Sequence, residues 1–594
     1  MTIQTIATLA VALLALTASP GSRQEPAGAV STAVVVRYGP NVHVSLEDHA
    51  LPHAEPHLAV SPVDSRTLLG ASIVYTHEMH GTTCKTFLSR DGGMRWTTTS
   101  FPERYTHGSA DPQVAFGRTG TAYFLMLGAG ASNATLFYRS PDGGFTWEPA
   151  RRLKGADHPQ VAVDPGDGPY AGRLYISAMH GIRSLRLTHS SDDGRSFSDA
   201  IPVPNPRKLW QLTLTPMVLR DGTLVVPYMA WDDAGGKSKA TATMIELVTT
   251  SDGGETFSAP QRVVDLPVEP WVQPTDLRQM VARDANPVFA ADQRSDRLYV
   301  AFARGGGGTR RVWLSSSADR GRTWTIPIVV DPQAPAGSVQ YQPMLAVNRA
   351  GALAVGWFDT RDGDGDRYAV YFAGSIDGGR SFSPARRVST ALSAPIGDIN
   401  LAPYPASEPT RRGELSLRFR PCLGRWGNGG DYMGLAADGS GMFHPLWVDS
   451  RDGVFQVWTT SVEVGPEDAG TGRQLVAEAA SANVTDRVSL IVDPPHYDLE
   501  GQIAVVPIRL KNTSTSPIYP PLLVEVRKTD GWTLLNGGPH RGPEGGSFDY
   551  SPALGDFAVL RPGEVTEAIR WRFRYSGLQS APTLTVEVTG SVRN

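Results

Sequence analysis

The chain has 594 residues, more than one compact core of ordinary size accommodates, so two or more domains are expected. Hydrophobic residues make up 41% of it and aromatic residues 8%, and 62 Gly with 46 Pro suit many turns between short strands. The net charge is −4 and the sequence has no basic tract, which argues against a nucleic-acid-binding protein.

A short apolar run extends from Ile6 to Leu16 and is followed by small residues. This pattern is typical of a secretory signal peptide, and a run of about 11 residues is too short to span a bilayer, which needs about 20. We therefore expect residues 1–29 to be a signal peptide. The protein would then be secreted or periplasmic, without a membrane span.

Six copies of a short phrase, Ser/Thr-x-Asp-x-Gly-x-x-aromatic, recur at near-regular spacing. The Asp side chain can accept hydrogen bonds from the backbone N–H groups that follow it, Gly supplies the positive φ of a tight turn, and the Trp or Phe begins a strand. Six such hairpin turns indicate a repeat architecture. The copies are SRDGGMRW (89–96), SPDGGFTW (140–147), SSDDGRSF (190–197), TSDGGETF (250–257), SADRGRTW (317–324) and SIDGGRSF (375–382).

A second repeat runs in phase with these turns. Before each turn lies a strand that often begins x-Pro, and then a second apolar strand, such as TLLGASIVY from Thr67. Alternation and an excess of β-branched and aromatic residues mark both as strands. The first strands of seven such units open at Glu55, Asp111, His158, Thr215, Asn286, Gln342 and Tyr432.

Seven antiparallel units of four strands predict an all-β fold with a seven-bladed β-propeller over residues 30–465. A six-bladed ring is the alternative, and it would leave one unit outside the ring. The seventh unit lacks the hairpin phrase, so its outer strand could come from the N-terminus, where 33–39 and 42–45 are strand-like. After a polar linker at 466–483, alternating segments over 484–594 predict an Ig-like β-sandwich.

In a propeller, the residues that open the first strands surround one axial depression, and the hairpin turns lie at the opposite face. A ring of polar groups there suits a small polar ligand, although it could equally serve as the wall of a water-filled channel. We therefore predict that His158, Asn286 and Gln342 bind substrate, together with the acidic residues Glu55 and Asp111.

The second strands end on the same face, and two of them end in near-copies of one motif. Asp359 and Arg361 follow Trp357, and Asp449 and Arg451 follow Trp447, while Arg304 ends another second strand. Paired Arg and Asp side chains could bind a carboxylate or a sugar diol. They could also be structural locks that hold the following loop.

The hairpin phrase is that of the Asp-box, and the chain from about Ala33 to Val464 resembles the sialidase (neuraminidase, or BNR-repeat) superfamily. The resemblance implies an exo-α-sialidase-like glycosidase with Tyr432, in GGDYMGLAADGSG, as the nucleophile. Asp431 or Glu55 would be the base that activates it, and Asp111 would be the general acid. The Arg that opens the first blade in that family is missing here, where the segment reads Ala-Glu-Pro-His at 54–57.

Three functions are compatible with these patterns. The first is a glycoside hydrolase that acts on a terminal, acidic sugar; the second is a non-catalytic propeller that binds a glycan or a protein. The third is a polysaccharide lyase that acts on uronates, with Tyr432 and His158 as acid and base. Carbohydrate is the expected partner in the enzymatic cases, and no cofactor is required.

Two further features fall near the predicted site. Cys84 and Cys422 are the two cysteines of the chain, and a disulfide between them would hold the long 389–430 insertion against the ring closure. Asp362, Asp364 and Asp366 alternate with Gly as in a calcium loop, so a structural calcium ion is the metal hypothesis. A solvated acidic turn is the alternative.

Overall fold

The described part of the chain excludes residues 1–32 and several internal segments. The computed structural model describes residues 33–48, 51–75, 82–99, 101, 108–128, 134–154, 157–181, 183–232, 242–266, 286–305, 309–363, 367–393, 429–451, 454–467, 480–498, 502–530, 532–536, 546–557, 559–575 and 583–592. Strands dominate these residues, and their helices are three short 3-10 turns, η1 (Leu46–Asp48), η4 (Thr485–Arg487) and η5 (Ser551–Phe557). No helix in these ranges is long and apolar enough to cross a membrane.

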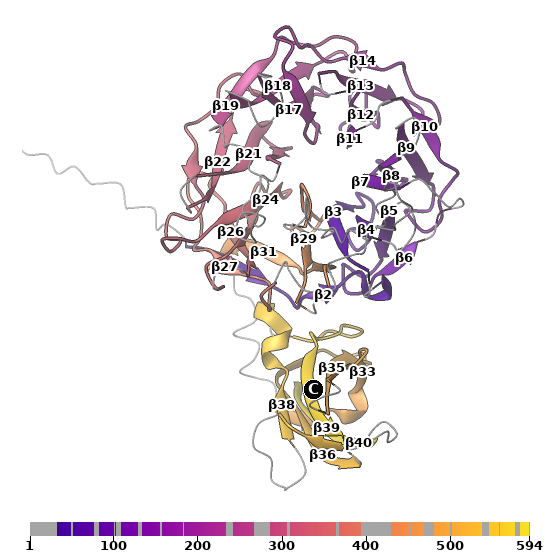
Figure 1. Ribbon diagram of the computed structural model, residues 1–594, viewed down its shortest axis with the longest axis vertical. Coiled ribbons are helices and arrows are strands. Elements are labelled where there is room, and N and C mark those ends of the chain that lie inside the picture. Colours follow the sequence, from indigo (N-terminus) through magenta and orange to yellow (C-terminus); the bar gives the residue numbers. More distant parts are fainter. Residues whose placement is uncertain are drawn as a thin grey trace, which may run out of the picture.

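Seven antiparallel sheets, here called ring sheets 1 to 7, follow one another along the chain and form a ring (Figure 1). Ring sheet 1 contains β3 (His53–Val60), β4 (Leu68–Tyr75), β5 (Thr82–Ser89) and β6 (Thr97–Thr99). Ring sheet 2 contains β7 (Ser109–Phe116), β8 (Ala122–Gly128), β9 (Ala134–Ser140) and β10 (Arg151–Leu153). Ring sheet 3 contains β11 (Asp157–Val163), β12 (Leu174–Met179), β13 (Leu185–Ser190) and β14 (Ile201–Pro202).

The next three ring sheets continue around the ring in chain order (Figure 1). Ring sheet 4 contains β15 (Trp210–Thr213), β16 (Met217–Val218), β17 (Leu224–Trp231), β18 (Thr243–Thr250) and β19 (Gln261–Leu266). Ring sheet 5 contains β20 (Val288–Asp292), β21 (Arg297–Arg304), β22 (Arg311–Ser317) and β23 (Ile328–Val329). Ring sheet 6 contains β24 (Gln340–Val347), β25 (Leu353–Asp359), β26 (Ala369–Ser375) and β27 (Arg386–Arg387).

Ring sheet 7 joins the two ends of the ring. It contains β28 (Gly434–Ala437), β29 (Phe443–Asp449), β30 (Gln456–Thr459) and β31 (Val462–Pro466), together with β1 (Val34–Tyr38) and β2 (Val42–His43). β1 pairs with β31 and β2 pairs with β30, so both strand-like N-terminal segments contribute to the outer edge, as predicted. β30 and β31 are two short strands, separated by residues 460–461.

The six hairpin phrases form turns between the last two strands of ring sheets 1 to 6. In ring sheet 2, the Asp142 carboxylate accepts hydrogen bonds from Ser140 Oγ (2.7 Å), Phe145 N (3.1 Å) and Thr146 N (2.9 Å). The pairing of strands places these turns at the end of each sheet opposite to the residues that open the inner strand, as in ring sheet 1, where Ser89 lies opposite Leu68. The prediction that these phrases form hairpin turns between strands is confirmed.

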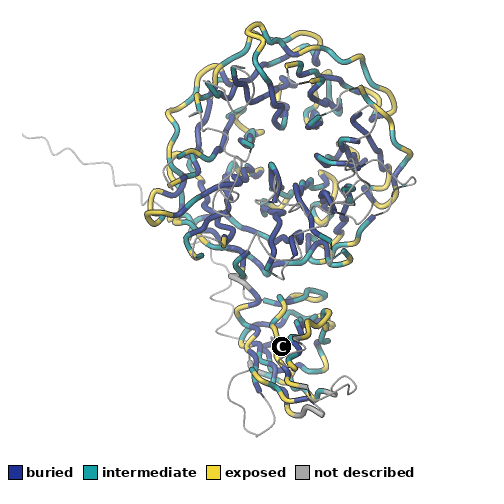
Figure 2. Tube along the Cα trace, in the orientation of Figure 1, coloured by how far each residue is buried: buried dark blue, intermediate teal, exposed yellow. Residues whose placement is uncertain are grey.

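Buried apolar side chains fill the space between neighbouring ring sheets, while the exposed residues gather at the outer turns (Figure 2). Trp357 and Trp447 each stand two residues before the Asp of the repeated Asp–Arg motif (Asp359 and Asp449), and both are fully buried. This placement explains why the strands carry apolar residues on both faces, since each sheet packs against two neighbours.

Two further sheets follow the ring and lie beside it (Figure 1). One contains β32 (Ala480–Asn483), β40 (Thr583–Val592), β36 (Ile518–Asp530) and β38 (Gly546–Asp549). The other contains β33 (Val488–Val492), β34 (His496–Asp498), β35 (Ile503–Asn512), β39 (Ile569–Tyr575) and β37 (Trp532–Leu534). They share a separate apolar core, in which the Phe548 and Trp571 rings stack with centroids 4.4 Å apart.

The C-terminal sheets contact the ring where it closes. Asn41, between β1 and β2, donates its backbone N–H to Glu567 Oε1 at 2.9 Å, and Arg451 lies 3.9 Å from the same oxygen. The Arg570 guanidinium donates to the Arg451 carbonyl oxygen at 3.0 Å. Burial raises the pKa of Glu567, and the Arg451 charge opposes that rise. Asn41 and Arg451 therefore take part both in closing the ring and in binding the C-terminal sheets.

We expect His53 to make stability depend on pH. His53 is 1% exposed, its Nδ1 lies 2.8 Å from Ser72 Oγ, and burial, followed by the His43 and Lys85 charges, lowers its pKa to about 3. The folded pKa lies below the unfolded value of 6.5, so this contribution to stability is complete above pH 6.5 and is lost as the pH falls towards 3. The loss is on the order of a few kcal/mol.

Urea denaturation between pH 7 and pH 4 tests this expectation. The free energy of unfolding should fall less steeply with acid in His53→Gln than in the wild type. His496→Gln replaces an exposed histidine of β34 and serves as the matched control. If the free energy of unfolding fell equally with acid in the wild type and in His53→Gln, His53 would not contribute to the pH dependence of stability.

Candidate active site

Four inner strands open with a residue in the left-handed backbone region followed by proline. The φ angles are 51° at Glu55, 54° at Asp111, 49° at His158 and 53° at Gln342. Such a conformation is unfavourable for a non-glycine residue, and a following proline restricts it further. At each position the strand pairing shifts, as in ring sheet 1, where Glu55 and Pro56 lie between the paired residues Ala54 and His57.

These bulges re-aim the side chains that open the strands. Because the same strained arrangement recurs in ring sheets 1, 2, 3 and 6, the surrounding structure must stabilise it, which is typical of functional sites. The x-Pro pattern in the sequence thus marks a local backbone geometry as well as a strand start. Thr215 and Asn286 also precede proline, although neither has a positive φ.

Asp111, one of these re-aimed residues, belongs to an acidic cluster with Asp157 and Asp431, whose charges act on it. The Asp111 carboxylate accepts a hydrogen bond from the His158 backbone N–H at 3.2 Å, and its Oδ1 lies 3.7 Å from His158 Nδ1. Burial raises the pKa of Asp111; the charges of Asp157 and Asp431 raise it further, whereas His158 lowers it. Asp111 is therefore a carboxyl group whose surroundings favour the protonated form.

Glu55 connects this cluster to the end of the ring. Its backbone N–H donates to the Gly429 carbonyl oxygen at 2.8 Å, and its Oε1 accepts from the Asp431 backbone N–H at 3.2 Å. Gln342 donates its side-chain amide to the Gly430 carbonyl oxygen. Asn286 donates its backbone N–H to the Asp431 carbonyl oxygen at 3.0 Å. Residues 429–431 thus bind to ring sheets 1 and 6 and to the residue that precedes ring sheet 5.

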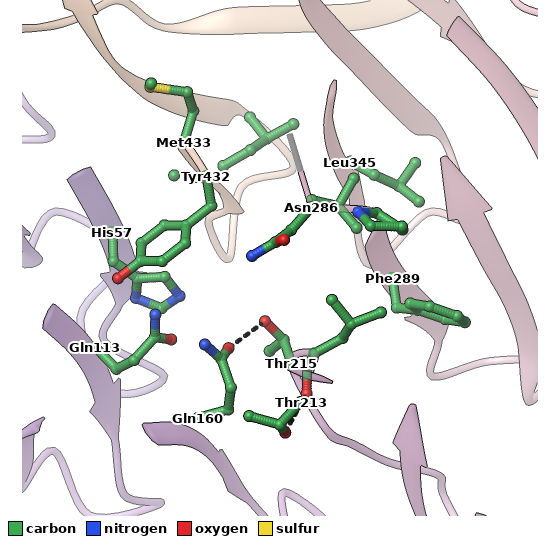
Figure 3. A pocket seen from close by; sticks show the side chains of 15 residues that line it. His57, Gln113, Gln160, Thr213, Thr215, Asn286, Phe289, Leu345, Tyr432 and Met433 are labelled. Atoms are coloured by element: carbon green, nitrogen blue, oxygen red, sulfur yellow. Dashed lines mark hydrogen bonds between the residues drawn. The ribbon is translucent and has the colours of Figure 1, made fainter. Parts of the chain in front are cut away.

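A cavity of about 110 Å³ is lined by residues of the inner strands, several of which Figure 3 shows. All seven ring sheets, or residues next to their inner strands, supply its wall. Its volume is below the roughly 300–1,000 Å³ of pockets for drug-sized ligands, so it suits one small ring rather than an oligomer. The lining residues are His57, Gln113, Gln160, Thr213, Leu214, Thr215, Asn286, Pro287, Val288, Phe289, Leu345, Tyr432, Met433, Gly434 and Leu435.

Tyr432 lies between the cavity and the acidic cluster. Its hydroxyl donates to the Pro112 carbonyl oxygen at 3.1 Å, and burial, followed by the charges of Glu55 and Asp111, raises its pKa well above the usual value. A raised pKa disfavours the phenolate that a nucleophile requires. Tyr432 lines the axial cavity, and its surroundings stabilise the neutral phenol.

His57 is a neutral donor beside Tyr432. Burial lowers its pKa to about 4, and its Nδ1 accepts a hydrogen bond from the Val114 backbone N–H at 3.2 Å. With Nδ1 as the acceptor, Nε2 carries the proton. Its ring stands edge-on to that of Tyr432, with centroids 6.3 Å apart.

None of the three arginines predicted to bind substrate lines the cavity, and two of them, Arg361 and Arg451, form ion pairs elsewhere. Arg361 pairs with Asp331 and with Asp359, and its guanidinium lies 4.2 Å from the centre of the Tyr371 ring. This arrangement fits the alternative of a structural lock.

The second copy of the motif has a similar arrangement, although its outer contacts differ. Arg451 pairs with Asp449 at 2.7 Å and lies 4.0 Å from the Trp458 ring. Whereas Arg361 reaches Asp331 of the ring, Arg451 reaches Asn41 at 3.1 Å, at the junction with the C-terminal sheets. Arg304 is exposed at the end of β21 and lies 5.8 Å from the Trp313 ring.

Among the described residues, one set could hold a metal ion. One ligand atom from each of Asp111, Asp157 and His158 lies within 4.8 Å of the others. The calcium hypothesis concerned a different loop, of which Asp364 and Asp366 lie outside the described ranges. Asp362 accepts a hydrogen bond from the Tyr371 hydroxyl at 2.7 Å and lies 3.4 Å from Arg387.

The predicted disulfide cannot be placed, because Cys422 lies outside the described residues. Cys84 is a buried free thiol in β5. Burial, and to a lesser extent the charges of Asp111 and Glu55, raises the pKa of this thiol, so it is a weak nucleophile.

Sequence reasoning missed Gln113, Gln160 and His57, which line the cavity. Each stands two residues after a strand-opening residue: His57 after Glu55, Gln113 after Asp111 and Gln160 after His158. The period of two along a strand was the available signal, since it places alternate side chains on one face. Gly430 was missed as well, because nothing in the sequence shows which backbone contacts it.

Comparison with known proteins gives distant structural neighbours. No protein-family model and no curated protein matches the chain. A Hadza microbial sialidase is 15% identical, with 74% of this chain and 93% of that chain covered at a TM-score of 0.37. An α-L-arabinofuranosidase from Fusarium graminearum is 14% identical, with 72% and 98% covered at 0.37. An ulvan lyase is 10% identical, with 58% and 78% covered at 0.35. Similarity at this level does not establish an activity.

Proposed function

We propose that the ring sheets are the blades of a seven-bladed β-propeller over residues 30–465. The contribution of all seven sheets to one cavity supports this arrangement, because a six-bladed ring would leave one sheet away from the axis. A linker at 466–483 and an Ig-like β-sandwich over 484–594 would follow. Export is part of the proposal, with residues 1–29 as a signal peptide.

We propose further that the protein is a glycoside hydrolase related to the sialidase-type propellers. The observation that carries this proposal is the buried carboxyl of Asp111, whose pKa is raised by burial and by the nearby charges of Asp157 and Asp431. Asp111 stands two residues before Gln113 on β7, and Gln113 lines the axial cavity. Glycoside hydrolysis generally uses one protonated carboxyl as general acid and a second carboxylate as base or nucleophile. Asp111 would donate a proton to the oxygen of the leaving group. Asp431 would act as the base and take a proton from the water molecule that attacks the sugar.

In this proposal Tyr432 positions the sugar and does not attack it. The hydrogen bond to Pro112 and the neighbouring carboxylates favour a neutral hydroxyl, which can bind a sugar oxygen. Glu55 holds residues 429–431 against ring sheet 1 and so fixes Asp431. Acceleration by a positioned acid or base is typically about 10²–10⁴-fold.

Release of the aryl group from a panel of 4-nitrophenyl glycosides, with a fluorogenic sialoside included, tests the activity. We expect hydrolysis of at least one member by the wild type and at least a hundredfold less by Asp431→Asn. Asp265→Asn, an exposed residue of β19, should retain wild-type activity. Sugar binding without hydrolysis would favour the non-catalytic propeller, and new ultraviolet absorbance from an unsaturated uronate would favour the lyase.

A further inference from the structure

We infer that the axial cavity binds an uncharged sugar ring and that Gln113 Oε1 determines this specificity. The inference rests on the proposed carbohydrate function and names the substrate class of the same site. It departs from the acidic sugar that the sialidase resemblance implies. Figure 3 shows Gln113, Gln160 and Asn286 pointing toward one another across the cavity.

The hydrogen bonds around Tyr432 fix the orientation of the Gln113 amide. Because the Tyr432 hydroxyl donates to Pro112 O, its oxygen can only accept from Gln113, which therefore presents its N–H to it. The other end of the amide, Oε1, is buried on the cavity wall and has no hydrogen-bond partner within the described residues. The Gln113 side chain is 1% exposed, so this acceptor is hidden from bulk solvent.

A buried acceptor without a partner is costly, and a ligand that donates a hydrogen bond removes the cost. A sugar hydroxyl is such a donor. Thr215 Oγ1 donates to Gln160 Oε1 at 2.8 Å, so Gln160 presents its amide N–H groups as donors. His57, which lies next to Gln113 in Figure 3, adds its Nε2–H as a further donor. The cavity thus presents acceptors and donors to the edge of a ligand whose hydroxyls can do both.

The remaining wall is apolar. Phe289, Leu345 and Leu214 line it together with Pro287 and Val288. A sugar ring has C–H groups that pack against such a surface while its hydroxyls face the amides. The volume of about 110 Å³ restricts the ligand to a single small ring.

The electrostatic environment of the cavity distinguishes acidic sugars from uncharged ones. Among the described residues that line the cavity, every side chain is neutral, since burial keeps His57 unprotonated at neutral pH. The neighbouring groups whose charges raise the pKa of Tyr432 are Glu55, Asp111 and, to a lesser extent, Cys84, and none of them can be a cation. A sugar carboxylate would therefore enter an acidic environment without a cation on the cavity wall, whereas an uncharged sugar would not be repelled.

Calorimetric titration of the full-length protein tests the inference without relying on catalysis. The probes are L-arabinose, D-galactose and D-glucose on one side, and N-acetylneuraminic acid and D-glucuronic acid on the other. We expect at least one uncharged sugar to bind at least tenfold more tightly than both acids. Tighter binding of either acid would overturn this inference and leave the proposed hydrolase intact, whereas binding of neither class would overturn both.

The variant Gln113→Met keeps a similar side-chain length and removes the amide. Affinity for the preferred uncharged sugar should fall about tenfold, as expected for the loss of one buried hydrogen bond. Gln261→Met is the matched control, because Gln261 on β19 also has a buried, unpartnered Oε1 and lies outside the cavity wall. Equal affinities of wild type and Gln113→Met, with both folded by thermal melting, would refute the role of Gln113. If Gln113→Met does not fold, the affinities of the wild type for uncharged and acidic sugars still test whether the cavity prefers an uncharged sugar.

Discussion

Replacing Asp111 by asparagine should slow glycoside hydrolysis at least a hundredfold while leaving the thermal midpoint nearly unchanged. The substitution keeps the shape of the side chain, and its amide oxygen can still accept the hydrogen bond from the His158 backbone N–H. It removes the proton that the leaving oxygen requires. Loss of a general acid typically costs about 10²–10⁴ in rate, so the effect on kcat should be far larger than that on sugar binding.

The pH profile gives a second readout for Asp111. Because burial raises the pKa of this carboxyl, it stays protonated to a higher pH than an exposed aspartate, and activity should decline as the pH rises through that folded-state value. The residual activity of Asp111→Asn should lack this alkaline limb. Asp167→Asn, at the exposed surface, is the control. An unchanged profile in Asp111→Asn would assign the acid to another residue.

Replacing Gly430 by alanine should abolish sugar binding and destabilise the ring. Gly430 has a φ of 111°, and an added Cβ would lie 2.2 Å from Glu55 Cγ and 2.9 Å from the Glu55 backbone nitrogen. The backbone of Glu55 is itself held by a hydrogen bond to Gly429, so it has little room to yield. We expect a loss of about 3 kcal/mol or more in the free energy of unfolding.

Denaturant unfolding and sugar-binding calorimetry together check the Gly430 prediction. Gly439→Ala is the matched control, since its added Cβ would make an ordinary contact of 3.5 Å with Ser65 and its φ is not positive. That control should change the free energy of unfolding by no more than about 0.5 kcal/mol. Wild-type stability and binding in Gly430→Ala would mean that residues 429–431 do not require their close contact with ring sheet 1.

The repeated turns made the ring sheets predictable from sequence, since local hydrogen bonds of Asp and Ser specify each turn without help from the rest of the fold. The strand starts were equally clear, because x-Pro recurs in phase. The separation of β30 from β31 in ring sheet 7 was not predictable from the sequence. The break between Thr459 and Val462 depends on pairing with two separate N-terminal strands, β2 and β1, and is thus a tertiary effect.

Prediction of the candidate site was less complete, for a physical reason. Glu55, Asp111, His158 and Gln342 share a backbone geometry that the sequence marks through the following proline, so their common placement could be predicted. The partners of Arg361 and Arg451 could not, because Asp331 and Glu567 are distant in the chain and no local pattern indicates them. The orientation of the Gln113 amide likewise depends on Tyr432 and on a backbone carbonyl.

The closing pair of β1 with β31 has a consequence for how the protein is made. Arg37 contacts Pro466 across 429 residues of chain, so the N-terminal strand emerges first during synthesis and has no partner until almost the whole ring has been translated. Such non-local pairing folds slowly, and a strand edge that waits exposed is prone to aggregate. Nascent chains that stop before residue 462 would lack the strand that pairs with β1, which makes complete translation a condition for a closed ring.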